Sequence, residues 1–263
     1  YATNGYAGGI SGTNTAQASI NNATVSNGVK VGVALGDASG FTPINNGTIT
    51  GGSIAECEIN ATGESIGAVT AINNATGTID NVELTGKVKF NSKATNVGGI
   101  TGSNSGNVQN VTVRNDSLNL NGLTANADIV NLGGAVGTNS GEVNTANVTL
   151  DVTDNLVKYV NLGGVVGSNS GTLDQCTYQG VLGTADTNNA NNIINGATNT
   201  GDTVGGIVGL NGGKVTGCTV ASITLQVQGA SALSDSQTTE QKLSSASHVG
   251  GIAGQNKGTV ESS

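Results

Sequence analysis

Residue types that commonly carry out catalysis are sparse in this chain of 263 residues, and they are spread along it. There is one histidine, His248, and there are three cysteines, Cys57, Cys176 and Cys218. A zinc peptidase would need a His-Glu-x-x-His helix or an equivalent set of ligands, which a single histidine does not supply. We therefore expect no catalytic role for His248 and no metal site built around it.

The acidic residues are scattered over different strand and loop positions, which argues against a paired-carboxylate hydrolase or lyase. Sugar-binding clefts also usually offer aromatic platforms, and the chain has only two Phe and four Tyr. A polysaccharide-acting enzyme remains an alternative, which a compact cluster of carboxylates on one face would support. The acidic residues considered are Glu56, Glu58, Asp80, Glu83, Asp116, Asp128, Glu142, Asp151, Asp154 and Asp174.

No cofactor is expected from the motifs present. The Gly-Gly-x-Gly-x-Asp nonapeptide of calcium-binding β-rolls is not matched, because the Gly-Gly unit here leads to an Asn in place of the Asp and occurs once per repeat. Incidental calcium bound by loop oxygens stays open.

Composition favours thin, stacked layers over a thick globular core. Glycine contributes 43 residues, aromatic residues make up 2%, and Met and Trp are absent. Burial must then come from many small contacts. The formal net charge is −8 and the nine Lys and Arg residues are dispersed, so a nucleic-acid partner is not expected. No segment approaches the roughly 20 apolar residues that span a bilayer. The chain lacks a recognisable signal peptide and starts at Tyr1, which suggests a processed piece of a longer protein.

An internal repeat organises the chain. The weaker copies start at Tyr6, Val31 and Ile66, and the spacing of the first Gly of successive copies drifts from 24 to 45 residues. Such drift indicates a solenoid with loop insertions. The clear copies are VGGITGSNSGNVQNVTV from Val97, LGGAVGTNSGEVNTANV from Leu132, LGGVVGSNSGTLDQCTY from Leu162, VGGIVGLNGGKVTGCTV from Val204 and VGGIAGQNKGTVESS from Val249.

Within each copy, Gly-Gly beside β-branched residues and alternating apolar positions predict short strands separated by turns. Helices are unfavourable here, because each interior Gly costs about 1 kcal/mol relative to Ala. We predict an all-β fold, a single parallel β-helix over residues 1–263 with about eight irregular coils, clearest over 97–260. The usual chirality of parallel crossovers makes it right-handed. Two inserted loops, 183–203 and 227–248, both precede a Gly-Gly strand and could contact partners along one edge.

Two sets of residues recur at fixed positions of the repeat and predict inward ladders. All three cysteines follow the pattern Gly-x-φ-x-x-Cys, where φ is apolar, and Ala23, Val82, Val111 and Ala146 take the same position in other copies. Small apolar residues alternating with Cys suit a buried ladder of free thiols. A bridge between Cys176 and Cys218 is the alternative. An amide ladder is predicted for Asn14, Asn104, Asn139, Asn169, Asn211 and Asn256.

The unit Gly-Gly-φ-φ-Gly-x-Asn-x-Gly-x-φ-x-x-Cys resembles the GLUG motif of bacterial cell-surface and exported proteins. This resemblance covers nearly the whole chain, most cleanly residues 97–260. It implies a repeat region like the non-catalytic β-helical repeats of immunoglobulin A metallopeptidase-like proteins. The copies depart from the pattern near residues 36–52.

The two ends of the chain suggest self-association. Ser263 stands at the Cys position of the last copy, and Tyr1, Ala2 and Thr3 resemble the residues that follow Cys176. The chain is then either cut from a longer array or a subunit that continues head to tail, with Tyr1, Ala2, Thr3, Val260 and Ser263 at the junction.

We expect a non-enzymatic structural or adhesive protein, located outside the cell or on a bacterial-type surface. It would act as a stalk, an adhesin or a filament subunit, with itself or a host or cell-surface ligand as partner. Its alternatives are a repeat segment of a large exported hydrolase or protease, and binding to ice or another crystal surface. The last is weakened because Thr101, Thr138, Thr149 and Thr172 do not share one position of the repeat.

Overall fold

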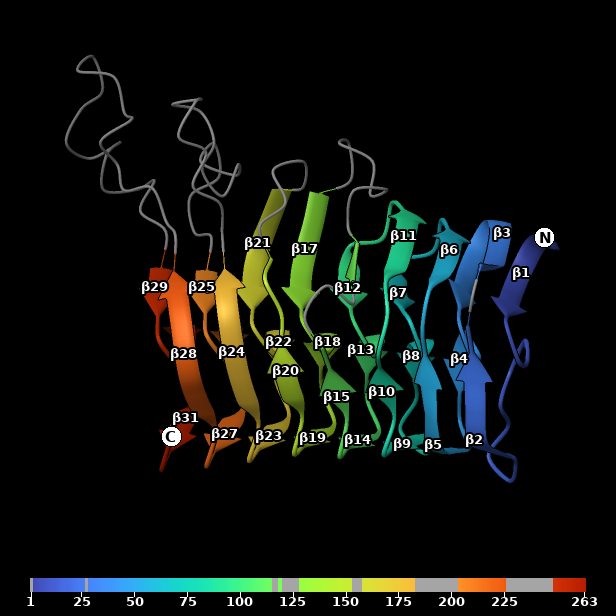
Figure 1. Ribbon diagram of the computed structural model, residues 1–263. Helices are drawn as coiled ribbons and strands as arrows, with labels where there is room; N and C mark the ends of the chain where they lie inside the picture. Colours follow the sequence, from blue (N-terminus) through green and yellow to red (C-terminus); the bar gives the residue numbers. More distant parts are fainter. Residues whose placement is uncertain are drawn as a thin grey trace, which may run out of the picture.

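The predicted fold class is confirmed: the chain forms an all-β solenoid of parallel strands. The computed structural model describes residues 2–26, 28–114, 118–119, 128–152, 158–182, 203–225 and 248–263. In these ranges every named element is a strand, and every strand pair is parallel. Figure 1 shows the strands stacked side by side along one axis, with the two termini at opposite ends.

Four sheets run along the axis, and we name them S1 to S4 in the order in which the chain visits them. S1 is β1 (Ala2–Gly8), β3 (Val29–Ser39), β6 (Cys57–Ala61), β11 (Val88–Ser92) and β16 (Leu118–Asn119). S2 is β7 (Ser65–Gly67), β12 (Asn96–Gly98), β17 (Asp128–Gly133), β21 (Lys158–Gly163), β25 (Thr203–Gly205) and β29 (His248–Gly250). S3 is β4 (Ile44–Asn45), β8 (Thr70–Asn73), β13 (Thr101–Asn104), β18 (Val136–Asn139), β22 (Val166–Asn169), β26 (Val208–Asn211) and β30 (Ala253–Asn256).

S4 is the largest sheet, and a bend divides it into two halves that the long strands β2 (Ser19–Val25) and β5 (Thr48–Ile54) join. Its first half is β9 (Thr78–Asp80), β14 (Asn107–Gln109), β19 (Glu142–Asn144), β23 (Thr172–Asp174), β27 (Lys214–Thr216) and β31 (Thr259–Glu261). Its second half is β10 (Glu83–Leu84), β15 (Thr112–Val113), β20 (Asn147–Thr149), β24 (Thr177–Leu182) and β28 (Thr219–Leu225).

The bend in S4 is made by one residue per layer in the left-handed conformation. Asn81 (φ 56°), Asn110 (φ 54°) and Gln175 (φ 52°) are examples, each two residues before a strand of the second half of the sheet. Asn is among the side chains that tolerate this conformation best, because it can bond to nearby backbone. The backbone N–H of Gln175 still donates to Thr216 O of the next layer, at 2.9 Å. The bend therefore turns the chain without breaking the stack.

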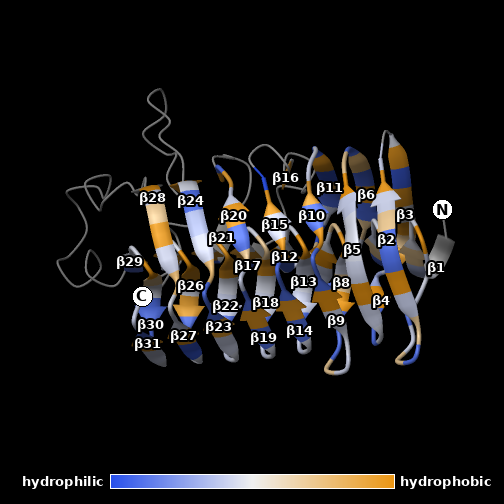
Figure 2. Ribbon diagram, turned by 60° about the horizontal axis from the view of Figure 1, so that its bottom comes forward, coloured by the Kyte–Doolittle hydropathy of each residue, from blue (hydrophilic) through white to orange (hydrophobic). Residues whose placement is uncertain are grey.

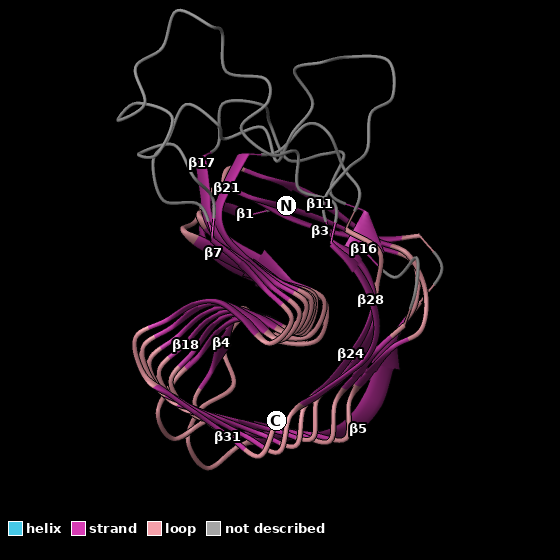
Figure 3. Cartoon of the chain, turned by 90° about the vertical axis from the view of Figure 1, so that its left-hand side faces the viewer, coloured by secondary structure: helices cyan, strands magenta, loops and turns pink. Residues whose placement is uncertain are grey.

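Glycine allows S2 and S3 to fold back on each other backbone to backbone. Figure 3 shows the turns between these sheets gathered in the middle of the cross-section. A Cβ added at Gly137 would lie 2.7 Å from Val97 N and 2.6 Å from Gly102 O. A Cβ added at Gly98 would lie 2.7 Å from Gly137 N. These distances are too short for any side chain, so the first and third Gly of the repeat are steric requirements.

Apolar columns from S1, S4 and the S2–S3 turn fill the interior. In Figure 2 hydrophobic and hydrophilic residues alternate along strands such as β2 and β3, as expected for strands with one face inward. One such column contains Ile49, Ile79, Val108, Val143, Leu173 and Val215, paired layer to layer and at most 1% exposed. Phe41, Phe90 and Tyr178 are also fully buried.

The repeat copy that the sequence pattern places at Val31 is wrong. Gly32 lies in S1 opposite Asn60, whereas the partner of Gly8 is Ser39. The second copy therefore begins with Ser39 and Gly40, and Gly40 N donates to Ala68 O of the next copy. Ser39 stands where the other copies have their first Gly, so this copy lacks the Gly-Gly signal. It lies in the part of the sequence that departs from the consensus.

Candidate functional site: stacked columns and end layers

A continuous amide ladder runs the length of the solenoid at the corner between S3 and S4. Each Asn from Asn14 to Asn211 donates its Nδ2 to Oδ1 of the Asn in the next layer toward the C-terminus, at 2.7 to 2.9 Å. The members within the described residues are Asn14, Asn45, Asn73, Asn104, Asn139, Asn169, Asn211 and Asn256. Asn45 and Asn73 were missed from the sequence because their copies lack the regular Gly spacing.

Backbone groups fix which end of each amide is the donor. Asn169 Nδ2 also donates to Gly171 O, and Gly171 N donates back to Asn169 Oδ1, both at 3.2 Å. Asn211 and Asn256 repeat this pattern with Gly213 and Gly258. Because a carbonyl can only accept and an N–H can only donate, the ladder has one direction.

A second amide ladder lies in S2 and runs the opposite way. Asn161 Nδ2 donates to Asn131 Oδ1 at 2.7 Å, and Asn131 Nδ2 donates to Asn96 Oδ1 at 2.8 Å. Thr203 extends it by donating its hydroxyl to Asn161 Oδ1 at 2.9 Å. The sequence signal was present but unused: an Asn stands two residues before the first Gly of three successive copies.

Most of the predicted cysteine column is present at the bend of S4. Val82, Val111, Ala146, Cys176 and Cys218 each follow the left-handed residue of their layer. Cys176 N donates to Cys218 Sγ at 3.4 Å, and Ser263 takes the next position, accepting from Cys218 N at 3.1 Å. The side chains at this position are small, and in the last two layers the sulfur of Cys218 and the hydroxyl oxygen of Ser263 accept from the backbone N–H of the layer before.

The assignment of Cys57 to this column is wrong. Cys57 opens β6 in S1, where it pairs with Val29 and Val88. Gly52 occupies the column position instead, paired with Ala23. The error has a physical origin: Glu56 is also left-handed (φ 55°). The same local bend therefore occurs at a second corner, and its sequence looks alike.

All three cysteines are buried free thiols in the structure. Burial raises the pKa of Cys57 to about 12. The hydrogen bond that the other two thiols share raises the pKa of Cys176, with burial adding to it, and lowers that of Cys218. The raised pKa values keep Cys57 and Cys176 in the unreactive thiol form at neutral pH, because the thiolate is the reactive form.

Two of the acidic residues considered above form ion pairs. Glu58 pairs with Lys30 at 2.9 Å, and Glu83 pairs with Arg114. Asp116 and Asp154 lie outside the described residues. Within the described ranges no group of three or more His, Cys, Asp and Glu side chains could hold a metal.

One carboxyl pair was missed from the sequence. Asp37 in β3 is partly buried, and desolvation first, then the charge of Glu64, raises its pKa. A raised carboxyl pKa beside a second carboxyl is the electrostatic signature of acid–base sites, although structural pairs show it too. The fully buried rings of Phe41, Phe90 and Tyr178 cannot serve as sugar platforms.

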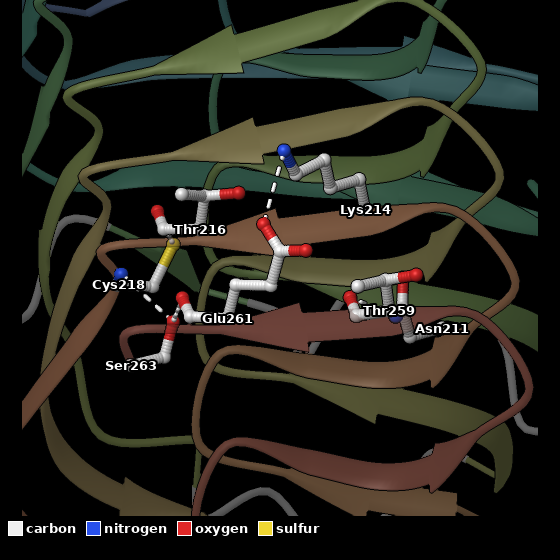
Figure 4. Close-up of polar contacts among 7 residues, drawn as sticks. All are labelled: Asn211, Lys214, Thr216, Cys218, Thr259, Glu261 and Ser263. Carbon is white, nitrogen blue, oxygen red and sulfur yellow. Dashed lines mark hydrogen bonds and ion pairs between the residues drawn. The ribbon is translucent and has the colours of Figure 1, made fainter.

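The C-terminal layer, β29 to β31, leaves inward columns open to solvent. Val249 is 42% exposed and Val260 is 37% exposed, whereas their partners Val204 and Val215 in the layer before are fully buried. Figure 4 shows this edge, where the ion pair between Lys214 and Glu261 measures 3.1 Å and Asn211 Nδ2 lies 3.3 Å from Thr259 O.

The predicted junction is wrong in its frame. Ala2 pairs with Val33 and Gly5 pairs with Gly36, so β1 belongs to S1. Thr177, with which the opening residues were aligned, belongs to the second half of S4. Ala2 and Thr3 therefore do not continue from the position of Ser263: the equivalents of residues 24–32 separate them. Short Thr-, Tyr- and Gly-containing segments matched by chance. Tyr1 lies outside the described residues.

Both predicted loops join the end of one layer to S2 of the next, between β24 and β25 and between β28 and β29. Apart from Thr203 and His248, residues 183–203 and 227–248 lie outside the described residues. The described strands that flank both loops thus belong to the same edge of the solenoid.

The described residues include no helix with the length and apolar character needed to cross a bilayer. No family model matches the chain, and neither the curated proteins nor the solved structures contain a significant match.

Proposed function

We propose that this chain is a non-enzymatic, extracellular structural solenoid, serving a bacterial-type surface as a stalk, an adhesin scaffold or a filament subunit. The carrying observation is the amide ladder that runs unbroken from Asn14 to Asn256. It joins every layer it passes through by a side-chain hydrogen bond parallel to the axis, in addition to the backbone pairs of the sheets.

Stacking of this kind supplies length and stiffness together. Each layer adds about 4.8 Å along the axis. Layers contact only their neighbours, so a load along the axis is borne by every interface in series. The buried amides strengthen each interface, because separating two layers would leave donors and acceptors without partners.

The resemblance of the repeat to the GLUG motif supports the extracellular setting, since that motif occurs in exported and cell-surface proteins. In the alternative, a repeat segment of a larger exported hydrolase or protease, this chain would also act as a rigid spacer. Adhesion would then depend on side chains or loops displayed by the rod.

Single-molecule force spectroscopy tests this proposal. The chain, held at its two ends, should resist extension until a threshold force and then lengthen in steps of about one repeat, because layers are lost one at a time. Smooth extension from zero force, as for a flexible linker, would contradict it. Release of reducing ends from a polysaccharide by the purified chain would favour the enzyme alternative instead.

A further inference from the structure

Two free thiols lie in successive layers of the solenoid, at the bend of S4. Cys176 and Cys218 directly precede Thr177 and Thr219, which are register partners in β24 and β28. Thr219 N donates to Cys176 O at 2.8 Å, so the two cysteines stack one strand spacing apart, about 4.8 Å. A disulfide needs Cα atoms roughly 4.4 to 6.8 Å apart. The backbone spacing at this site therefore suits a disulfide between the two layers.

The two side chains also leave the backbone in similar directions and meet. The residues before them, Gln175 and Gly217, are both left-handed (φ 52° and φ 60°), so both cysteines follow the same local bend. Cys176 N donates to Cys218 Sγ at 3.4 Å, and the thiols share a hydrogen bond that lowers the pKa of Cys218. The sulfur atoms are thus neighbours before any bond forms.

The third cysteine cannot compete for either thiol. Cys57 opens β6, after β5 in the same layer, and β5 lies four strand steps from β24 in S4. At about 4.8 Å a step, the axial distance between Cys57 and Cys176 is about 19 Å, and Cys218 lies one layer farther. This distance is far beyond the reach of a disulfide. The folded stack therefore allows one pairing, between Cys176 and Cys218.

We propose that Cys176 and Cys218 form an oxidation site, at which a disulfide joins two successive layers of the solenoid covalently. The oxidant is a low-molecular-weight disulfide. The thiolate of Cys218 attacks one oxidant sulfur and releases the other as a thiolate. The sulfur of Cys176 loses its proton, attacks the Cys218 sulfur of the mixed disulfide and releases the second oxidant sulfur. The protein thiols give up two electrons and two protons, and the oxidant becomes two thiols.

The bond would close a longer segment of chain than in the layers before it. The chain runs 42 residues from Cys176 to Cys218, whereas 30 residues separate Asn147 and Thr177, which stack one layer earlier in the same half of S4. The longer segment contains the inserted loop 183–203. Because a longer closed loop removes more conformational freedom from the unfolded chain, the bond stabilises most where an insertion lengthens the connection.

Burial determines when the site can react. Both cysteine side chains are fully buried in the folded chain, so the exchange takes place during folding, before these layers close. A natural oxidant requires an oxidising compartment, and in this respect the proposal rests on the extracellular location proposed above. The pairing itself follows from the register of the layers, so it can be tested with the purified chain whatever its location.

Peptide mapping of the refolded chain tests the pairing. The chain is refolded from urea with glutathione disulfide, its remaining thiols are blocked with iodoacetamide, and it is digested with trypsin. Cleavage after Lys214 separates the two cysteines into peptides 159–214 and 215–242. Mass spectrometry should find these peptides linked until a reductant is added, with the blocking group on Cys57. Two unlinked peptides from a chain with the circular dichroism of a β fold, or any disulfide of Cys57, overturn the proposal.

Urea unfolding measures what the bond contributes. The equilibrium constant for unfolding should be about thirtyfold or more smaller in the oxidised chain than in the reduced chain. Cys57→Ser should keep this dependence on reductant. Cys218→Ser, which introduces the residue that Ser263 supplies in the next layer, should lose it and unfold like the reduced chain. Equal stability of the oxidised and reduced chains rejects a stabilising bond, and it leaves the structural function intact because that function depends on the amide ladder.

Discussion

The amide column and the cysteine column lie at neighbouring corners of the same layers, yet the residue type is constant in the first and changes in the second. The amide column contains Asn in every layer from Asn14 to Asn256. The cysteine column changes from layer to layer: Ala23, Gly52, Val82, Val111, Ala146, Cys176, Cys218 and Ser263.

The difference shows what each column demands. An Asn in the ladder must donate and accept at once, so any replacement leaves buried polar atoms in two neighbouring layers without partners. A residue in the cysteine column needs only to be small and to fill space, a condition that several side chains meet. In these two columns, burial by itself still allows several residue types. Burial of a polar group that must be paired allows only Asn.

The largest effect is expected where sterics rather than polarity forbid change. Gly209→Ala would place a Cβ 2.7 Å from both Gly167 O and Leu162 N, which are backbone atoms that cannot move aside. We expect the free energy of unfolding to fall by about 3 kcal/mol or more. Gly212→Ala is the matched control in the same layer, because its Cβ would lie 3.6 Å from Asn169 O, an ordinary contact. Urea unfolding of both variants measures the contrast, and equal losses would disprove steric control.

The second-largest effect is expected when a member of the amide column is replaced. Asn139→Leu removes the acceptor of Asn104 Nδ2 and the donor to Asn169 Oδ1. We expect a loss of about 2 to 3 kcal/mol, since both neighbouring amides are buried and keep only their weaker backbone partners. The control Asn147→Ala, on an exposed position, should change stability by less than about 0.5 kcal/mol. A loss for Asn139→Leu no larger than that of the control would mean that the ladder does not stabilise the stack.

The smallest effect is expected in the cysteine column, which accepts several small side chains. Cys176→Val should change the free energy of unfolding by less than about 1.5 kcal/mol, because Val82 and Val111 already occupy the same column in earlier layers. Cys176→Asn should cost more than the valine variant, since it buries an amide with no ladder to join. Thermal unfolding of the pair provides the measurement, and the reverse order of stability would refute the contrast between the columns.

The sequence by itself determined the fold class and the positions of most of the ladder and bend residues within a layer. Recurrence of Gly-Gly with alternating apolar residues specifies strands that stack, because each short strand can bury its inward face only against a neighbouring layer. The position of Asn139 or Asn211 in the ladder, and of Val111 or Cys176 at the bend, followed from the same recurrence. In each case a strong local constraint, a steric limit or a polar group to be paired, left a visible residue type.

Tertiary structure decided what local pattern could not distinguish. Cys57 and Cys176 follow the same kind of left-handed residue, and only strand pairing shows that they lie at different corners. Ser39 in place of the first Gly is recognised by its partner Gly8, and the frame of β1 by the pairing of Ala2 with Val33. The polarity of the ladder also needed coordinates, because an Asn in a sequence has no direction until neighbouring backbone groups orient its amide.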